Sequence, residues 1–176
     1  PEALLKELDE LTDRGISVDG RLFISATAHL VMPYHKVLEK AGEDSQGSEK
    51  LGTTLRGIGP AYRDKVERTH GLRVIDLLDA NSLREKLTGT IKEKNKILTR
   101  IYGQEPLDDG EIIDSYLQSA EKLREFVTDT SVLLNCLLDE NKTVLFEGAQ
   151  GTLLDIDHGT YPFVTSSNTT AGGACT

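Results

Sequence analysis

Residues 52–73 read GTTLRGIGPAYRDKVERTHGLR, and this stretch organises what we expect of the chain. It holds five basic and two acidic residues, a local charge of +3 in a chain whose formal charge is −9. Such a concentrated positive potential attracts a small anion without making the whole surface bind nucleic acid. Glycines let the backbone approach a ligand closely, Thr53 and Thr54 add hydroxyl donors, and Pro60 suits the first turn of a helix. The stretch predicts a phosphate- or carboxylate-binding loop followed by a basic helix, with an exposed loop and a solvated charged helix as the alternative.

A second informative stretch follows an apolar run near the end of the sequence. Residues 143–146, TVLF, are rich in strand formers, and the segment GAQG follows at 148–151. A strand, a glycine loop and a helix in succession are how α/β proteins present a ligand at the carboxyl end of a strand. Gln150 lies in this loop, where its amide can bind a base or a hydroxyl. Residues 165–170 form a polar loop with five hydroxyl groups, which suits a phosphate; a plain Ser/Thr turn is the alternative.

Both stretches resemble the adenylosuccinate synthetase family. The segments GIGPAYRDKVER at 57–68, FEGAQGTLLD at 146–155 and TSSNTTAGG at 165–173 are similar to long motifs of that family and occur in the expected order. One departure is Leu55, where many members have Gly or Lys. The resemblance covers most of the 176 residues. It implies a fold related to nucleotide triphosphatases, of which this chain holds part of a mostly parallel sheet.

The resemblance also implies an activity. The family joins IMP and L-aspartate into adenylosuccinate during purine nucleotide and AMP biosynthesis, with GTP as co-substrate and Mg²⁺ as cofactor. Thr54, Gln150 and Thr165 match positions that bind IMP in the same subunit, and Arg68 matches the arginine that reaches the IMP of the neighbouring subunit in a homodimer. The family's catalytic residues, magnesium ligands and GTP and aspartate contacts should lie outside this chain. We therefore assign no catalytic residue and no metal ligand here.

Other classes of function stay open. A phosphosugar-using transferase would also need a Gly/Thr loop and a basic helix, although it would not explain Gln150 and the 165–170 loop together. A non-catalytic nucleotide-binding module is the second alternative. Family members are much longer, and the sequence has no GxxxxGK[ST] motif. We therefore expect residues 1–176 to be an internal part of a single domain, without the N-terminal phosphate loop and the C-terminal part, and inactive as a ligase by itself.

Composition narrows the class of protein. With 176 residues and 38% hydrophobic residues the chain is long enough to bury a core. An excess of acidic residues, 29 against 20 basic ones, argues against a general nucleic-acid binder. No apolar run reaches the length of a membrane span, so we expect no membrane partner. Cys136 and Cys175 are the two cysteines, which fits a reduced, cytoplasmic setting.

Hydrophobic periodicity predicts the elements. Strand and helix signals alternate, which favours an α/β fold with a helix-rich insertion. Helices are expected over residues 1–14, 28–41, 83–101 and about 110–140, with a possible division at 128–131; strands are expected at 22–24 and 143–146. Residues 42–50 have no large apolar side chain and predict a mobile loop that either closes over a ligand or is an exposed linker. Asp155, Asp157 and His158 lie close enough to bind a divalent ion, but such groups more often cap turns.

Overall fold

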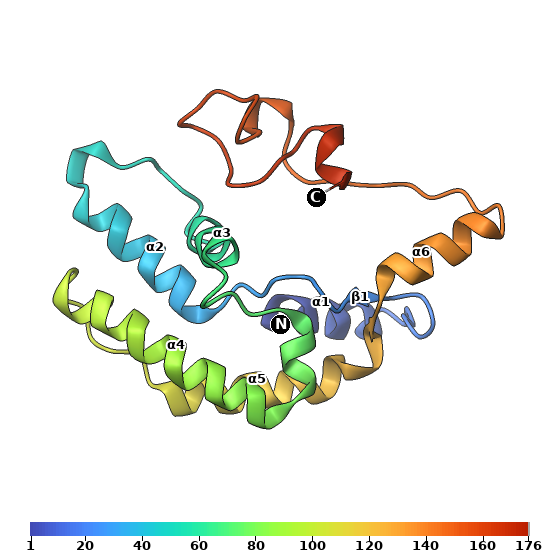
Figure 1. Cartoon of the computed structure of the whole chain (residues 1–176), viewed down its shortest axis with the longest axis horizontal. Helices are drawn as coiled ribbons and strands as arrows, with labels where there is room; N and C mark the ends of the chain where they lie inside the picture. The colour runs from blue at the N-terminus through green and yellow to red at the C-terminus, as the bar shows by residue number, and fades with distance from the viewer. Residues whose placement is uncertain (176) are drawn as a thin grey trace.

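The computed structural model describes residues 1–175 as an α/β arrangement dominated by helices (Figure 1). Within these residues two short strands, β1 (Ile24–Ser25) and β2 (Val127–Thr128), pair in parallel with Ile24 opposite Val127. The helices are α1 (Glu2–Asp13), α2 (Pro33–Ser45), α3 (Ile58–Glu67), α4 (Ala80–Arg100), α5 (Asp109–Leu123) and α6 (Thr130–Asp139). The predicted α/β class, with a parallel sheet and a helix-rich part, is confirmed.

The core lies between α4, α5 and the 3₁₀ segment Val74–Leu78. Leu83, Leu87 and Ile91 recur four residues apart on one face of α4 and are fully buried there. Each such side chain contributes about 1.5–3 kcal/mol when it is removed from water. A smaller cluster joins α2 to the end of α4 through Leu38 and Leu98. Apolar side chains therefore pack α2, α4 and α5 against one another.

The predicted helix over residues 28–41 begins later than expected. Residues 28–32 are extended, because the Leu30 N–H donates to the Leu72 carbonyl oxygen at 2.9 Å and the Val74 N–H donates to that of Ala28 at 2.8 Å. α2 starts at Pro33, whose missing N–H costs nothing at the first helical position. Periodicity alone did not reveal this pairing, since it depends on residues 40 positions away.

The expected loop over residues 42–50 is partly wrong. α2 continues to Ser45, and a 3₁₀ turn covers Gly47–Glu49. The polar composition of residues 42–50 predicted a loop, but a helix whose outer face is solvated needs few apolar residues in its last turn. The mobility of residues 42–50 stays a prediction.

The expected long helix over residues 110–140 is two helices. α5 ends at Leu123, a 3₁₀ turn at Arg124–Phe126 and strand β2 follow, and Asp129 caps α6 by accepting from the N–H groups of Ser131 and Val132. The division at 128–131 is confirmed. The two helices must separate here because β2 pairs with β1 and so joins distant parts of the chain.

The expected strand at residues 143–146 does not form within the described part of the chain. These residues are extended, but no described segment pairs with them, and the side chains of Leu145 and Phe146 are 88% and 61% exposed. A strand needs a neighbour for its backbone hydrogen bonds, which propensity does not supply. In Figure 1 this segment leads away from α6 to the turns of residues 150–175, part of which faces the loop before α3. None of the helices described is long and apolar enough to cross a membrane.

Candidate functional site

A pocket of about 610 Å³ lies between two segments that are far apart in the sequence. One side is the loop before α3, and the other is the turn-rich segment after residue 149. Thr54, Gln150 and Thr165 all line it. The full lining, which we call the threonine pocket, is Leu51, Gly52, Thr53, Thr54, Arg56, Ile58, Gln150, Leu154, Phe163, Val164, Thr165 and Ser166. Three hydroxyl-bearing threonines, an arginine and an amide thus converge on one apolar-walled cavity.

The loop of residues 52–57 holds its shape through glycine. Gly52 and Gly57 have φ of 77° and 81°, in the left-handed region that glycine adopts at little cost. Gly57 is buried against α2, and a Cβ there would lie 2.9 Å from the Cβ of His35. The N–H groups of both glycines donate to glutamate side chains on α2, so they are not free to hold a ligand. The sequence prediction that the glycines bring bare backbone to a ligand is thus not supported at these two amides.

The loop of residues 52–57 presents hydroxyl and guanidinium groups, and not the N–H groups of Gly52 and Gly57, to the pocket. The Oγ1 atom of Thr53 is buried and has no hydrogen-bond partner among residues 1–175. A buried hydroxyl without a partner loses the free energy of a hydrogen bond, so a ligand or water at this position would satisfy it. Arg56 lines the same pocket, is exposed, and makes no ion pair with the residues described.

The opposite wall is organised around the buried carboxylate of Asp155. Its Oδ1 accepts from the N–H groups of Asp157 and His158 at 2.9 and 3.0 Å. Its Oδ2 accepts from those of Thr169 and Thr170 at 2.6 and 3.1 Å. Burial acts to raise the pKa of Asp155, but these four donors outweigh it and hold the pKa well below its usual range. The carboxylate therefore stays ionised and closes the 155–170 segment into a loop.

The acidic residues near Asp155 bind groups of the protein itself. All of the hydrogen bonds of Asp155 go to backbone N–H groups, and Asp157 accepts from the amide of Asn168 at 2.7 Å. Over residues 1–175 no group of three or more His, Cys, Asp or Glu side chains is placed to hold a metal ion. The expectation that these acidic residues cap turns is confirmed for Asp155.

A buried charged network connects the helices beneath the loop. The Met32 N–H donates to Nδ1 of His35 at 2.9 Å, so Nε2 carries the ring proton that faces Oδ2 of Asp64 at 3.1 Å. Nζ of Lys94 donates to the other oxygen, Oδ1, at 2.7 Å. Burial acts to raise the pKa of Asp64, and the hydrogen bonds from His35 and Lys94 outweigh it and lower that pKa. The network joins α2, α3 and α4 at one carboxylate.

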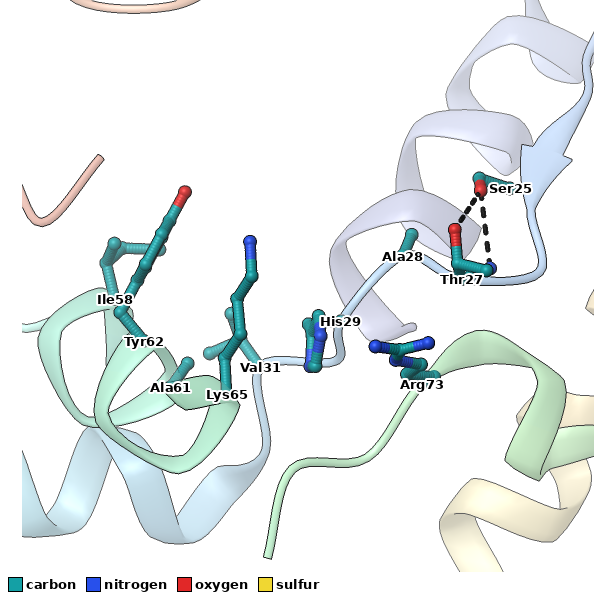
Figure 2. Close-up of a pocket in the computed structure, with 10 residues that line it drawn as sticks. All are labelled: Ser25, Thr27, Ala28, His29, Val31, Ile58, Ala61, Tyr62, Lys65 and Arg73. Atoms are coloured by element: carbon teal, nitrogen blue, oxygen red, sulfur yellow. Dashed lines mark hydrogen bonds between the residues drawn. The ribbon is translucent and has the colours of Figure 1, made fainter. Parts of the chain in front are cut away.

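A second pocket, of about 650 Å³, is lined by α3 and by residues 25–31, and shares Ile58 with the threonine pocket (Figure 2). Tyr62 and Lys65 project side by side from α3, with the ammonium 5.3 Å from the ring centroid, and Arg73 projects toward His29. Partial burial and the neighbouring charges of Arg73 and Lys65 lower the pKa of His29, which is therefore neutral at pH 7. The basic stretch is thus split: Arg56 serves the threonine pocket, whereas Lys65 and Arg73 line this one.

The adenylosuccinate synthetase family model matches residues 1–176. The chain belongs to the adenylosuccinate synthetase family. The adenylosuccinate synthetase of Thermobifida fusca is 57% identical over 175 residues, which are 99% of this chain and 40% of that protein. That of Koribacter versatilis is 52% identical over 174 residues, again 99% of this chain and 39% of that protein. This chain therefore spans about two fifths of the curated relatives it matches.

A solved structure agrees. The structure of fully ligated adenylosuccinate synthetase from Plasmodium falciparum superposes with a TM-score of 0.87 at 33% identity, covering 98% of this chain and 39% of that chain. The sequence-based assignment to the adenylosuccinate synthetase family and the expected fold are confirmed.

The structure brings together three of the four site residues that were predicted from the sequence. Thr54, Gln150 and Thr165 meet in the threonine pocket, whereas Arg68 does not line it. Arg68 is exposed at the C-terminal end of α3, with φ of 70°, and pairs with no acidic side chain in the described chain. Gln150 has φ of 63° and Leu55 has φ of 56°, also left-handed. Leu55 thus adopts a backbone conformation that glycine adopts without strain.

The sequence did not reveal the residues that hold the loop of the threonine pocket in place. Asp64 is one of the two acidic residues in the basic stretch, and nothing in the sequence singles out His35. A single acid among basic residues on the buried side of α3 is a signal that could have identified Asp64, since a buried carboxylate requires donors. Lys94 gave no such signal, because it lies in a Lys- and Glu-rich helix whose other charges are solvated.

Proposed function

We propose that this chain is the IMP-binding part of an enzyme that joins IMP and L-aspartate to form adenylosuccinate, with GTP as co-substrate. The observation that carries the proposal is the convergence of Thr54, Gln150 and Thr165 on one pocket. Its volume of about 610 Å³ is within the range of roughly 300–1,000 Å³ that is usual for small-molecule sites. Family membership supplies the substrate class.

Each pocket residue has a role that its chemistry supports. The hydroxyls of Thr54 and Thr165 donate to the 5′-phosphate of IMP, and the unpartnered Thr53 hydroxyl and the Arg56 guanidinium add positive and hydrogen-bonding character beside them. The Gln150 amide, with one donor and one acceptor end, binds a hydroxyl or base edge of the nucleoside. The apolar side chains of Leu154, Phe163 and Val164 form an apolar wall of the pocket.

The reaction transfers the γ-phosphoryl group of GTP to the 6-oxygen of IMP and releases GDP, and the aspartate amine then displaces the phosphate. Positioning of IMP is this chain's contribution, since a substrate held in the reacting geometry no longer loses its freedom of motion in the transition state. Mg²⁺ would neutralise charge on the transferred phosphoryl group. No ligand set for it exists in the described chain. We assign its ligands, and the catalytic acid and base, to other parts of the longer protein, which we place in the cytoplasm.

The proposed role of Arg68 requires a homodimer. Arg68 is exposed, carries no ion pair among the described residues, and projects from the far end of the helix whose first turn borders the threonine pocket. An arginine fork binds a phosphate through two parallel hydrogen bonds. In the proposed dimer Arg68 completes the phosphate site of the neighbouring subunit, so each active site draws on both chains.

The test uses the full-length protein. Arg68→Leu removes a charge-assisted contact worth about 1.5–3 kcal/mol and should weaken apparent IMP affinity roughly tenfold to a hundredfold. Mixing it with Thr54→Ala, which is defective in the same-subunit contact, should restore activity, because the mixed dimer has one site with both groups intact. Mixed dimers that form but recover no activity would exclude the cross-subunit role. Wild-type protein that makes no adenylosuccinate from IMP, aspartate and GTP would exclude the function itself.

A further inference from the structure

Two glutamates on α2 hold the site loop by both of its ends. Glu39 and Glu43 lie four residues apart, on one face of the helix, and both are half-buried. Oε2 of Glu43 accepts from the Gly52 N–H at 2.9 Å, and Oε2 of Glu39 accepts from the Gly57 N–H at 2.6 Å. Hydrogen bonds to an ionised acceptor are shorter and stronger than those between neutral groups. The loop of residues 52–57 is therefore attached to α2 at its first and last residue.

The second attachment point, Gly57, is closely packed. Gly57 lies against the backbone of α2, where a Cβ would come within 3.0 Å of the Lys36 nitrogen. Its carbonyl oxygen accepts from the Ala61 N–H, so Gly57 also begins α3. The carboxylate of Glu39 thus lies at the N-terminal end of α3, where the helix dipole favours a negative charge. α2 is in turn fixed to α3 and α4 by the buried network at Asp64.

The residues between the two attachments are those that line the threonine pocket. Thr53, Thr54 and Arg56 lie between Gly52 and Gly57, and Leu55 has a left-handed backbone in the middle. A four-residue span with both ends fixed has few conformations left. We propose that Glu39 and Glu43 are positioning residues, which fix the direction in which Thr54 and Arg56 face the bound nucleotide. This inference rests on the proposed IMP-binding function.

The carboxylates also decide which groups can reach the ligand. They occupy the N–H groups of Gly52 and Gly57, so the loop meets an anion with side chains and not with these amides. A glutamate that contacted the ligand itself would repel its phosphate. Neither glutamate is among the lining residues of the threonine pocket, so neither carboxylate is placed to contact the ligand there.

The experiment uses the full-length enzyme with Glu39→Ala, Glu43→Ala and the isosteric Glu39→Gln and Glu43→Gln. Glu49→Ala is the matched control, because Glu49 is an exposed carboxylate in the next turn with no hydrogen bond or ion pair to the described residues. Loss of either attachment should lower kcat/KM for IMP roughly tenfold to a hundredfold through loop misplacement. The KM values for GTP and aspartate should not change. The Gln variants, which keep an acceptor oxygen, should recover part of the loss.

A second readout does not depend on activity. Hydrogen exchange of the peptide spanning residues 51–58 should accelerate in the Ala variants and stay near the wild-type rate in Glu49→Ala. A purely structural role would reduce the amount of active enzyme, so kcat would fall for all substrates while KM for IMP stayed constant; that result overturns the proposal. Ala variants with the kinetics and exchange of Glu49→Ala overturn it as well. If Thr54→Ala raises KM for IMP in the same assays, the IMP-binding function stands even where the positioning role fails.

Discussion

Replacing Gly57 by alanine tests the close packing of the site loop against α2. Two costs can be worked from its surroundings. A residue with a Cβ in the left-handed region costs about 1–2 kcal/mol, and φ here is 81°. The new Cβ would also meet the His35 Cβ at 2.9 Å and the α2 backbone at 3.0 Å, and overpacking of this kind costs about 1–3 kcal/mol. Alanine lowers the entropy of the unfolded chain, which offsets about 0.4–1 kcal/mol. We therefore expect the free energy of unfolding to fall by about 1–5 kcal/mol.

Gly89→Ala is the matched control for this substitution. Gly89 is exposed within α4, and a Cβ there would have nothing within 4 Å. Because alanine favours the helix by about 1 kcal/mol over glycine, this variant should be stabilised. Denaturant unfolding of the two full-length variants, followed by circular dichroism, measures both shifts. Equal midpoints for Gly57→Ala and Gly89→Ala would refute the close contact between the loop and α2.

Three further outcomes follow from the buried network and the pocket. Asp64→Asn should destabilise the full-length protein by about 3–5 kcal/mol at neutral pH because Lys94 loses its partner. The difference in stability between this variant and the wild type should shrink in acid. The pKa of Asp64 is lowered in the folded protein, so its carboxylate stabilises the fold fully above the unfolded pKa of about 4 and loses this effect as pH falls through the folded value. Unfolding midpoints of the two proteins that stay parallel from neutral pH into acid would contradict this. Lys94→Met should be destabilising too, and Asp64→Asn combined with it should cost less than the sum, as a double-mutant cycle would reveal. Gln150→Ala should raise KM for IMP, with a loss of about 0.5–1.5 kcal/mol, and leave KM for GTP unchanged in steady-state assays.

The sequence could predict what depends on local chemistry. Helices α1 and α4 follow from their own periodicity, and the break before α6 from a cluster of capping residues. Thr54, Gln150 and Thr165 could be named because they lie in long motifs of one family. Their meeting in one pocket depends on how two distant segments fold toward each other, and no local pattern carries that information.

What the sequence could not predict depends on partners elsewhere in the chain. Residues 28–32 have helical composition but are extended, because their backbone groups bind residues 72–74. Residues 143–146 have strand composition but find no partner within the described residues. Nothing in the sequence distinguishes Glu39 and Glu43 from solvated charges on a helix, whereas the structure shows that they accept hydrogen bonds from Gly52 and Gly57. Propensity describes a residue's preference, whereas these outcomes were decided by hydrogen bonds over long distances in sequence.

Arg68 and Gln150 both have a left-handed backbone, so at these two positions the residue that is best for stability differs from the one that is best for ligand affinity. Glycine would relax the main chain at either one, so a search for thermal tolerance alone would choose it. Such a choice would delete the guanidinium and the amide that we expect to meet the nucleotide. Comparing Arg68→Gly with Arg68→Ala, and Gln150→Gly with Gln150→Ala, separates the two effects, since each pair loses the same side-chain contact. The glycine member should be the more stable by about 1–2 kcal/mol, which would make these residues places where heat resistance and substrate use cannot be improved together.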